Sequence, residues 1–143
     1  MTYDPNCEFC RIVHRLDQAR IVCETDVAVA FFPLKPAALG HTLVVPKEHV
    51  SDLLSIVERA AGLLMATTVR VARAIDHALH PDGMNLISSV GEVASQTVFH
   101  LHLHLVPRWK GDHIPNIWPP PEPWPEAAKD DVAQLIRDAC YEV

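Results

Sequence analysis

The alternation of hydrophobic and polar residues changes its period along the chain, and each change predicts an element. Two β-prone runs, residues 20–25 and 27–32, meet at Asp26 and predict a hairpin. A third strand is expected over residues 41–45, which a glycine precedes and a proline follows, and a fourth over residues 84–90. Short strands joined by turns favour an antiparallel sheet.

Helical periodicity dominates the middle of the chain. Apolar residues recur every three or four positions between Leu53 and Leu79, which predicts a long amphipathic helix with Ser51 as its N-cap and a break near Ser55. A last helix over residues 127–141 is expected to turn four residues inward: Val132, Leu135, Ile136 and Ala139. The expected fold class is α+β, an antiparallel sheet of about five strands with one long helix packed on it.

The fifth predicted strand, residues 96–108, contains three histidines that alternate with leucine. Because a strand has a period of two, His100, His102 and His104 are expected on one face. The other face is expected in the core and consists of Phe99, Leu101, Leu103 and Leu105. A histidine-rich sheet surface is the simpler interpretation, but strict alternation followed by basic residues favours a functional site.

Strand geometry limits what these histidines do together. At roughly 3.3 Å per residue, His100 and His104 lie on the order of 13 Å apart, too far to bind one metal ion. At most two of the three share a metal, so at least one imidazole is available as a nucleophile, a proton donor or a ligand for phosphate oxygens.

Composition excludes some classes of protein. The chain has 143 residues, a net charge of −6, 49% hydrophobic and 21% charged residues, which fits one globular domain and argues against a general nucleic-acid binder. No secretory signal and no apolar stretch of about 20 residues is found. We therefore expect a cytoplasmic location and no membrane association. Residues 111–143 begin with a proline-rich segment and are expected to form a C-terminal extension with a short closing helix, separate from a domain over residues 1–110.

Cys7 and Cys10 form a Cys-x-x-Cys motif in a short predicted helical turn. The motif alone fits zinc binding, redox chemistry or two buried thiols. A thioredoxin-like site requires a preceding strand, for which the first six residues leave no room. A zinc site requires two further ligands, and His49 and His100 are the candidates for a tetrahedral Cys₂His₂ site.

These motifs resemble the histidine triad (HIT) superfamily, in particular its bacterial Hint-like branch. The resemblance rests on the histidine run at residues 100–106, on Gln96-Thr97-Val98 before it, on residues 40–49 (GHTLVVPKEH) and on the Cys-x-x-Cys start. It implies a HIT-like domain over residues 1–110, a homodimer with a continuous sheet, and a structural zinc on Cys7, Cys10, His49 and His100. No organic cofactor is expected.

The resemblance also implies roles for the remaining candidates. His102, the middle histidine, would attack the α-phosphorus of a nucleotide conjugate, and His104 would stabilise the phosphoryl oxygens or assist the leaving group. His41 would lie near the phosphate, although capping or packing also suits it. The phosphate-binding residues implied are Ser95, Gln96 and Thr97.

Three positions depart from the family pattern. Pro33 occupies the place of an aspartate that holds the ribose hydroxyls, and Ser89, a substrate-binding candidate, that of an asparagine. Ser95 replaces a common glycine and puts a side chain where backbone would approach a phosphate. The nucleophile is therefore expected to be intact, and the nucleoside contacts to differ.

The first functional hypothesis is a hydrolase of nucleoside phosphoramidates or related nucleotide conjugates that acts through a nucleotidyl-His102 intermediate. The alternative is a zinc-stabilised nucleotide-binding or regulatory module with little turnover. A metallohydrolase with a catalytic ion on His102 and His104 is less favoured, because the strand offers no carboxylate to complete the site. A scaffold that dimerises by its sheet edge predicts no ligand.

Overall fold

The structure is a computed structural model that describes residues 2–143. The chain divides into two compact units, Met1–His113 and Ile114–Val143, which are described separately. The first unit contains a five-stranded sheet in the order β1-β2-β3-β5-β4, in which every neighbouring pair is antiparallel. The strands are β1 (Ile21–Glu24), β2 (Ala28–Phe31), β3 (Thr42–Pro46), β4 (Gly83–Ile87) and β5 (Leu103–Arg108). The predicted α+β fold class is confirmed.

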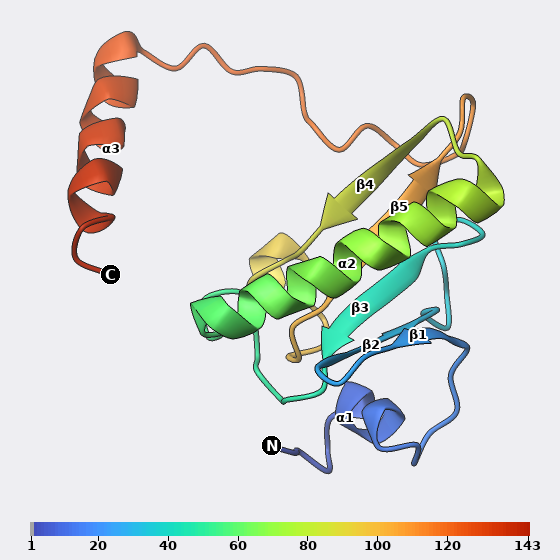
Figure 1. The fold of residues 1–143 in the computed structure, drawn as a ribbon. Helices are drawn as coiled ribbons and strands as arrows, with labels where there is room; N and C mark the ends of the chain where they lie inside the picture. The colour runs from blue at the N-terminus through green and yellow to red at the C-terminus, as the bar shows by residue number, and fades with distance from the viewer. Residues whose placement is uncertain (1) are drawn as a thin grey trace. The chain divides into compact units, whose positions relative to one another are not determined.

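Helices cover both faces of this sheet. The long helix α2 (Glu58–Leu79) lies across one face (Figure 1), where its Leu64 and Val71 belong to a core cluster with Val44 of β3. The short helix α1 (Glu8–Val13) packs Phe9 against Phe31 on the other face. The central strands β2 and β3 are therefore buried on both sides, which explains their nearly continuous apolar sequences.

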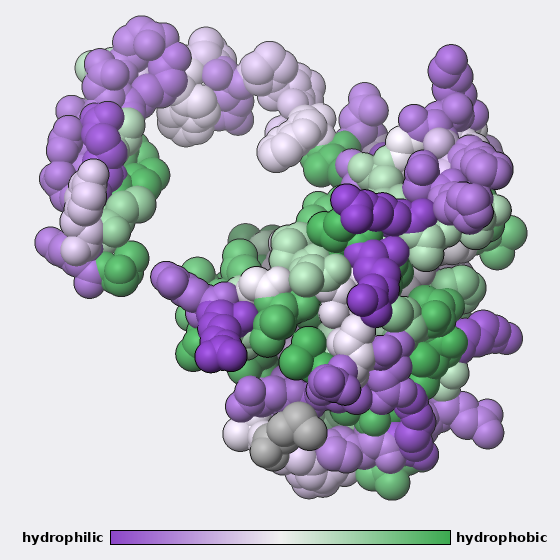
Figure 2. Space-filling view, viewed as in Figure 1, coloured by the Kyte–Doolittle hydropathy of each residue, from purple (hydrophilic) through white to green (hydrophobic). Residues whose placement is uncertain are grey.

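The α2 side of the first unit faces the viewer in Figure 2 and carries a mixture of hydrophilic and hydrophobic residues. This mixture is expected for the solvent side of an amphipathic helix. Within residues 2–143, no helix is long and apolar enough to cross a membrane.

The start of α2 differs from the prediction. The helix begins at Glu58, with Val57 as N-cap, and Ser51 does not cap it. Asp52 instead closes a separate turn, because its Oδ1 accepts hydrogen bonds from the backbone N–H groups of Leu54 and Ser55. Leu53 consequently lies outside the helix and is exposed, although the periodicity placed it on the apolar face.

The histidine strand is also shorter than predicted. β5 begins at Leu103, so His100 and His102 precede it in an irregular segment, where the Leu101 N–H donates to the Val50 carbonyl at 2.7 Å. Leu101, Leu103 and Leu105 are buried as predicted, but Phe99 is 47% exposed, so its assignment to the core was wrong. A period-two rule does not apply where the backbone leaves the sheet.

The second unit has one helix, α3 (Glu126–Ala139), preceded by a segment without helix or strand. The helix agrees with the predicted one to within two residues at each end. None of its residues is buried, so the prediction that its apolar residues turn inward was wrong for all four: Val132, Leu135, Ile136 and Ala139.

Candidate active site and metal centre

Four predicted metal ligands from three separate segments meet beside the sheet. The ligand atoms of Cys7, Cys10, His49 and His100 all lie within 4.8 Å of one another, and no other set of three or more such residues is found among residues 2–143. Cys7 Sγ lies 3.5 Å and Cys10 Sγ 3.6 Å from His100 Nδ1, and Cys10 Sγ lies 3.3 Å from His49 Nδ1.

These distances fit a tetrahedral zinc ion. With Zn–S near 2.3 Å and Zn–N near 2.0 Å, tetrahedral geometry separates a sulfur from a nitrogen ligand by about 3.5 Å. His100 is oriented for the same role, since its Nε2–H donates to the Pro46 carbonyl at 2.9 Å and leaves the Nδ1 lone pair toward the thiols. Burial lowers the pKa of His100 to about 4, so its ring is neutral at pH 7, as a ligand must be.

The protonation state of the two thiols depends on whether a cation is bound between them. Burial is the main cause that raises the pKa of Cys10, and the neighbouring Cys7 adds to it. A raised pKa favours the protonated thiol. A bound divalent ion would favour the thiolate instead, because a coordinated thiol gives up its proton.

His102 lies next in the chain and has a different environment. It is 8% exposed, and its Nδ1 lies 2.7 Å from the backbone carbonyl of His100. A carbonyl only accepts, so Nδ1 carries the proton and the Nε2 of the neutral ring has a free lone pair. The backbone therefore fixes the tautomer that a nucleophilic imidazole requires.

His104 is held by a chain of hydrogen bonds that ends at a backbone amide. The Ala37 N–H donates to His41 Nδ1 at 3.0 Å, so His41 carries its proton on Nε2. That Nε2 lies 2.9 Å from His104 Nδ1 and donates to it. The proton of neutral His104 is therefore on Nε2, where it is available as a donor.

Burial keeps this pair neutral. It lowers the pKa of His41, and it lowers the pKa of His104 to about 4, with smaller effects from His102 and His41. The His102 and His104 rings lie with their centroids 4.8 Å apart. The site thus places the Nε2 of His102, on the ring whose Nδ1 is bound to the His100 carbonyl, beside the Nε2–H of His104.

Both rings line a cavity of about 600 Å³. Its polar residues include Asp17, Gln18 and Lys35, and Asp17 is held by two hydrogen bonds of 2.9 Å from Arg11, which lower the pKa of its carboxyl. The apolar wall is formed by Phe9, Ile12, Phe31, Leu43 and Val98. The sequence analysis did not predict that Phe9, Asp17 and Gln18 line this cavity. Of the three, only Phe9 had a sequence signal, its position between the two cysteines.

The predicted substrate-binding residues differ in whether they line the cavity. Thr97 lines the cavity, whereas Ser89, Ser95 and Gln96 are not among its lining residues. The buried Gln96 amide nitrogen donates to the carbonyls of Ser51 (2.7 Å) and Val98 (3.1 Å). This side chain supports the loop around the histidines, which differs from the phosphate contact predicted for it.

Pro33 also lines the cavity, at the position where the family pattern has an aspartate. A proline ring supplies no hydrogen-bond partner for a sugar hydroxyl. Acidic and amide side chains that line the cavity elsewhere include Asp17 and Gln18, in the loop that follows α1, and Glu8 in α1 itself.

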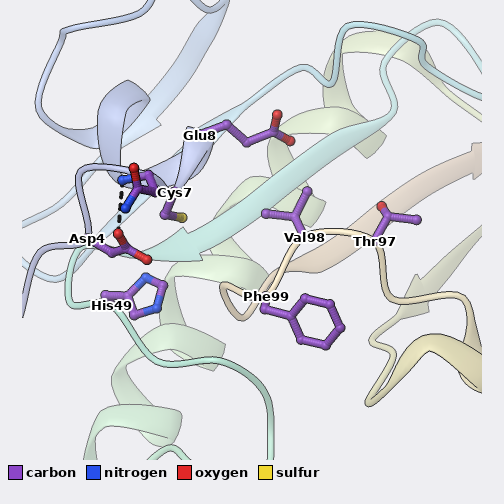
Figure 3. Close-up of a pocket in the computed structure, with 8 residues that line it drawn as sticks. Asp4, Cys7, Glu8, His49, Thr97, Val98 and Phe99 are labelled. Atoms are coloured by element: carbon purple, nitrogen blue, oxygen red, sulfur yellow. Dashed lines mark hydrogen bonds between the residues drawn. The ribbon is translucent and has the colours of Figure 1, made fainter.

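A second hollow of about 460 Å³ adjoins the metal cluster (Figure 3). It is lined by Cys7 and His49 and shares Glu8, Thr97 and Val98 with the histidine cavity. The hollow beside the four candidate metal ligands and the histidine cavity thus adjoin each other.

The HIT domain family model matches residues 15–111. An uncharacterized HIT-like protein of Saccharolobus solfataricus is 40% identical over 106 residues, which cover 74% of this chain and 76% of that protein. A HIT family protein from Bacillus anthracis has a crystal structure that superposes with a TM-score of 0.87 at 33% identity, covering 96% of this chain and 99% of the other. The chain therefore belongs to the HIT family.

Two further solved structures bear on the site. A Zn-bound histidine triad family protein from Mycobacterium smegmatis has a TM-score of 0.73 at 38% identity, covering 81% of this chain and 84% of that one. A HIT family hydrolase from Clostridium thermocellum has a TM-score of 0.69 at 34% identity, covering 80% and 99%.

Proposed function

We propose that this protein hydrolyses nucleoside phosphoramidates or related nucleotide conjugates through a covalent nucleotidyl-His102 intermediate. The observation that carries the proposal is the pair of opposite tautomers in one cavity: a free lone pair on His102 Nε2 beside a proton on His104 Nε2. The similarity to the HIT family hydrolase of Clostridium thermocellum supports the same class of reaction.

In the first step the Nε2 lone pair of His102 attacks the α-phosphorus, and the bond from phosphorus to the leaving group breaks. The leaving group departs with the bonding electrons and, where it is an amine, takes a proton from solvent. In the second step water attacks phosphorus, the P–Nε2 bond breaks, and one proton of the water returns to solvent. A nucleoside monophosphate and free His102 result.

His104 stabilises the negative charge of the phosphoryl group in both steps. Its Nε2–H is proposed to donate a hydrogen bond to a phosphoryl oxygen, where negative charge grows in the transition state. His41 holds His104 in the donor tautomer, since the Ala37 N–H fixes the proton of His41 on the nitrogen that faces His104. Thr97, on the cavity wall, is the second proposed phosphate donor.

The nucleoside is proposed to occupy the rest of the cavity, with its base against the apolar wall that includes Phe9 and Phe31. The ribose hydroxyls are proposed to donate to Asp17, whose ionised carboxylate is held by Arg11 and is thereby preorganised as an acceptor. Gln18 is a second partner. This arrangement supplies sugar contacts without an acidic residue at position 33.

The metal centre is proposed to hold a structural zinc, a role that the donor spacing and the Zn-bound relative support. A homodimer that continues the sheet is proposed at β4, which is an edge strand and leaves Leu86 half exposed. Light scattering of the purified protein tests the dimer. The cytoplasm is the proposed location, consistent with four cysteines that are all free.

Mass spectrometry after a rapid acid-free quench tests the central step. Wild-type protein mixed with adenosine phosphoramidate is expected to gain the mass of an adenylyl group on the peptide that contains His102, and His102→Ala is expected to lose both adduct and turnover. His77→Ala, which removes an exposed histidine from α2, is the matched control and should form the adduct normally.

The alternative function, a nucleotide-binding module with little turnover, has a distinct signature. It predicts that AMP binds while no adduct and no steady-state hydrolysis appear with any of the conjugates tried. That result, obtained with folded, zinc-loaded protein, would overturn the hydrolase proposal and leave the binding site intact.

A further inference from the structure

Helix α1, which Cys7 caps and which contains Cys10, also touches His102. In α1, Phe9 lies between Cys7 and Cys10, and its side chain is buried. The Phe9 ring meets the His102 ring edge-on, with centroids 5.1 Å apart and an interplanar angle of 84°. It meets the His100 ring in the same way at 6.0 Å. One phenyl ring therefore contacts a metal ligand and the proposed nucleophile.

α1 depends on external anchoring for its position. It has six residues, and isolated helices shorter than about 12 residues are marginal in water. Its N-cap is Cys7, whose Sγ accepts from the Cys10 N–H at 3.5 Å. The atom that caps the helix is thus also one of the four candidate ligand atoms of the cluster, so an ion bound there would hold the start of the helix.

A second connection runs through His100. Its Nδ1 faces both thiols, its Nε2 donates to Pro46, and its backbone carbonyl accepts from His102 Nδ1. The residue whose ring belongs to the metal cluster is therefore also the residue whose carbonyl sets the tautomer of His102. The cluster is thus connected to the His102 ring in two ways, through the ring contact with Phe9 and through the His100 carbonyl at Nδ1.

We infer that metal binding at the four-residue cluster positions His102 for reaction, in addition to stabilising the fold, and that Phe9 is a positioning residue that transmits this effect. When the ion is bound, α1 holds the Phe9 ring against His102 while the His100 carbonyl holds Nδ1–H. When the ion is removed, both constraints relax and the ring samples other orientations and the other tautomer. The kinetic part of this inference rests on the proposed nucleophilic role of His102, and the spectroscopic part does not.

The test uses full-length protein labelled with ¹⁵N-histidine, in its zinc-loaded and chelator-stripped forms. Zinc-loaded wild type is expected to show one His102 tautomer, protonated at Nδ1, whereas the stripped form is expected to show tautomer exchange or broadening at His102 while His77 stays unchanged. Circular dichroism reports whether the stripped protein remains folded. A folded, stripped protein with an unaltered His102 spectrum would overturn the inference.

Phe9→Leu tests the same idea without removing the ion, which matters if the stripped protein unfolds. This variant should keep its zinc, show altered His102 ring signals and lose on the order of tenfold in kcat, because small misplacements of a reacting group are costly. Phe99→Leu is the matched control, since Phe99 is half exposed and lies outside the histidine cavity. If Phe9→Leu changes KM alone and leaves the His102 spectrum as in wild type, Phe9 only lines the cavity and the inference fails. If wild type forms no adduct but the spectral changes occur, the proposed function fails and the coupling stands.

Discussion

His100 and His104 belong to the same short segment but have opposite surroundings. His100 is fully buried, with Nδ1 directed at two thiols and Nε2 bound to Pro46. His104 has one nitrogen bound to His41 and lines a cavity. The same residue type is thus suited to metal binding at one end and to chemistry at the other. The difference comes from the partners that the rest of the fold brings to each ring.

The largest expected effect is the loss of zinc and of stability when His100 is replaced. His100→Ala should lose the bound zinc and on the order of 3 kcal/mol of stability, because structural zinc contributes directly to folding and a buried ligand is removed. This loss corresponds to roughly 10 °C in the melting temperature of a domain of this size. Metal analysis and thermal unfolding of zinc-loaded samples measure it. A His100→Ala protein with full zinc content and an unchanged melting temperature would contradict the assignment.

Replacing His104 should leave the bound metal in place and slow the reaction. His104→Ala is expected to keep its zinc and to lose on the order of 100-fold in kcat, because a donor to the developing phosphoryl charge is lost. Steady-state kinetics with adenosine phosphoramidate, together with zinc analysis, check this. Equal loss of zinc in His104→Ala and His100→Ala would erase the distinction between the two ends.

The pH dependence of stability sharpens the comparison further. The pKa of His104 is lowered from 6.5 to about 4 by burial, so between these values the unfolded chain binds a proton that the folded chain does not. The free energy of unfolding should therefore fall as pH drops from about 6.5 toward 4, and this slope should be smaller in His104→Ala. Urea unfolding at pH 7 and pH 5 measures it, and identical slopes in the two proteins would show that His104 is not held neutral by burial.

The smallest effect is expected in the loop between β4 and β5. Ser95 has φ 71° and ψ 23°, a left-handed conformation that costs a residue with a side chain about 1–2 kcal/mol. Ser95→Gly removes this strain but gains entropy in the unfolded chain, so its net effect should stay within about 1 kcal/mol. Ser95→Val should be clearly destabilising, and a neutral Ser95→Val would show that the loop relaxes freely. Urea unfolding of both variants decides.

The fold was largely predictable because it depends on local periodicity. Strand and helix periods located the five strands and α2, and errors arose where local hydrogen bonds intervened, as where Asp52 closes a turn ahead of α2. Phe99 was misplaced because the backbone leaves the sheet before Leu103.

Parts of the candidate site were less accessible to sequence reasoning. Gln96 has the residue type of a phosphate donor, but its amide is bound to two carbonyls of neighbouring loops. Asp17 and Gln18 lie in a loop without periodicity or motif, and only the folded chain brings them to the same cavity as His102. No local pattern reports such contacts, because they join segments far apart in the sequence.

The sequence by itself determined the antiparallel sheet with its covering helix, the alternation of the three histidines and the four metal-ligand candidates, since residue type and spacing carry this information. Only the tertiary structure decided which nitrogen of each ring carries a proton. For His100 and His104 that choice depends on the Pro46 carbonyl, the Ala37 N–H and the His41 ring, which reach the histidine segment from more than 50 residues away. For His102 it depends on the irregular backbone that brings the His100 carbonyl, two residues earlier, to its Nδ1. Hydrogen-bond partners at such separations are fixed by packing, and they turn three similar imidazoles into different chemical groups.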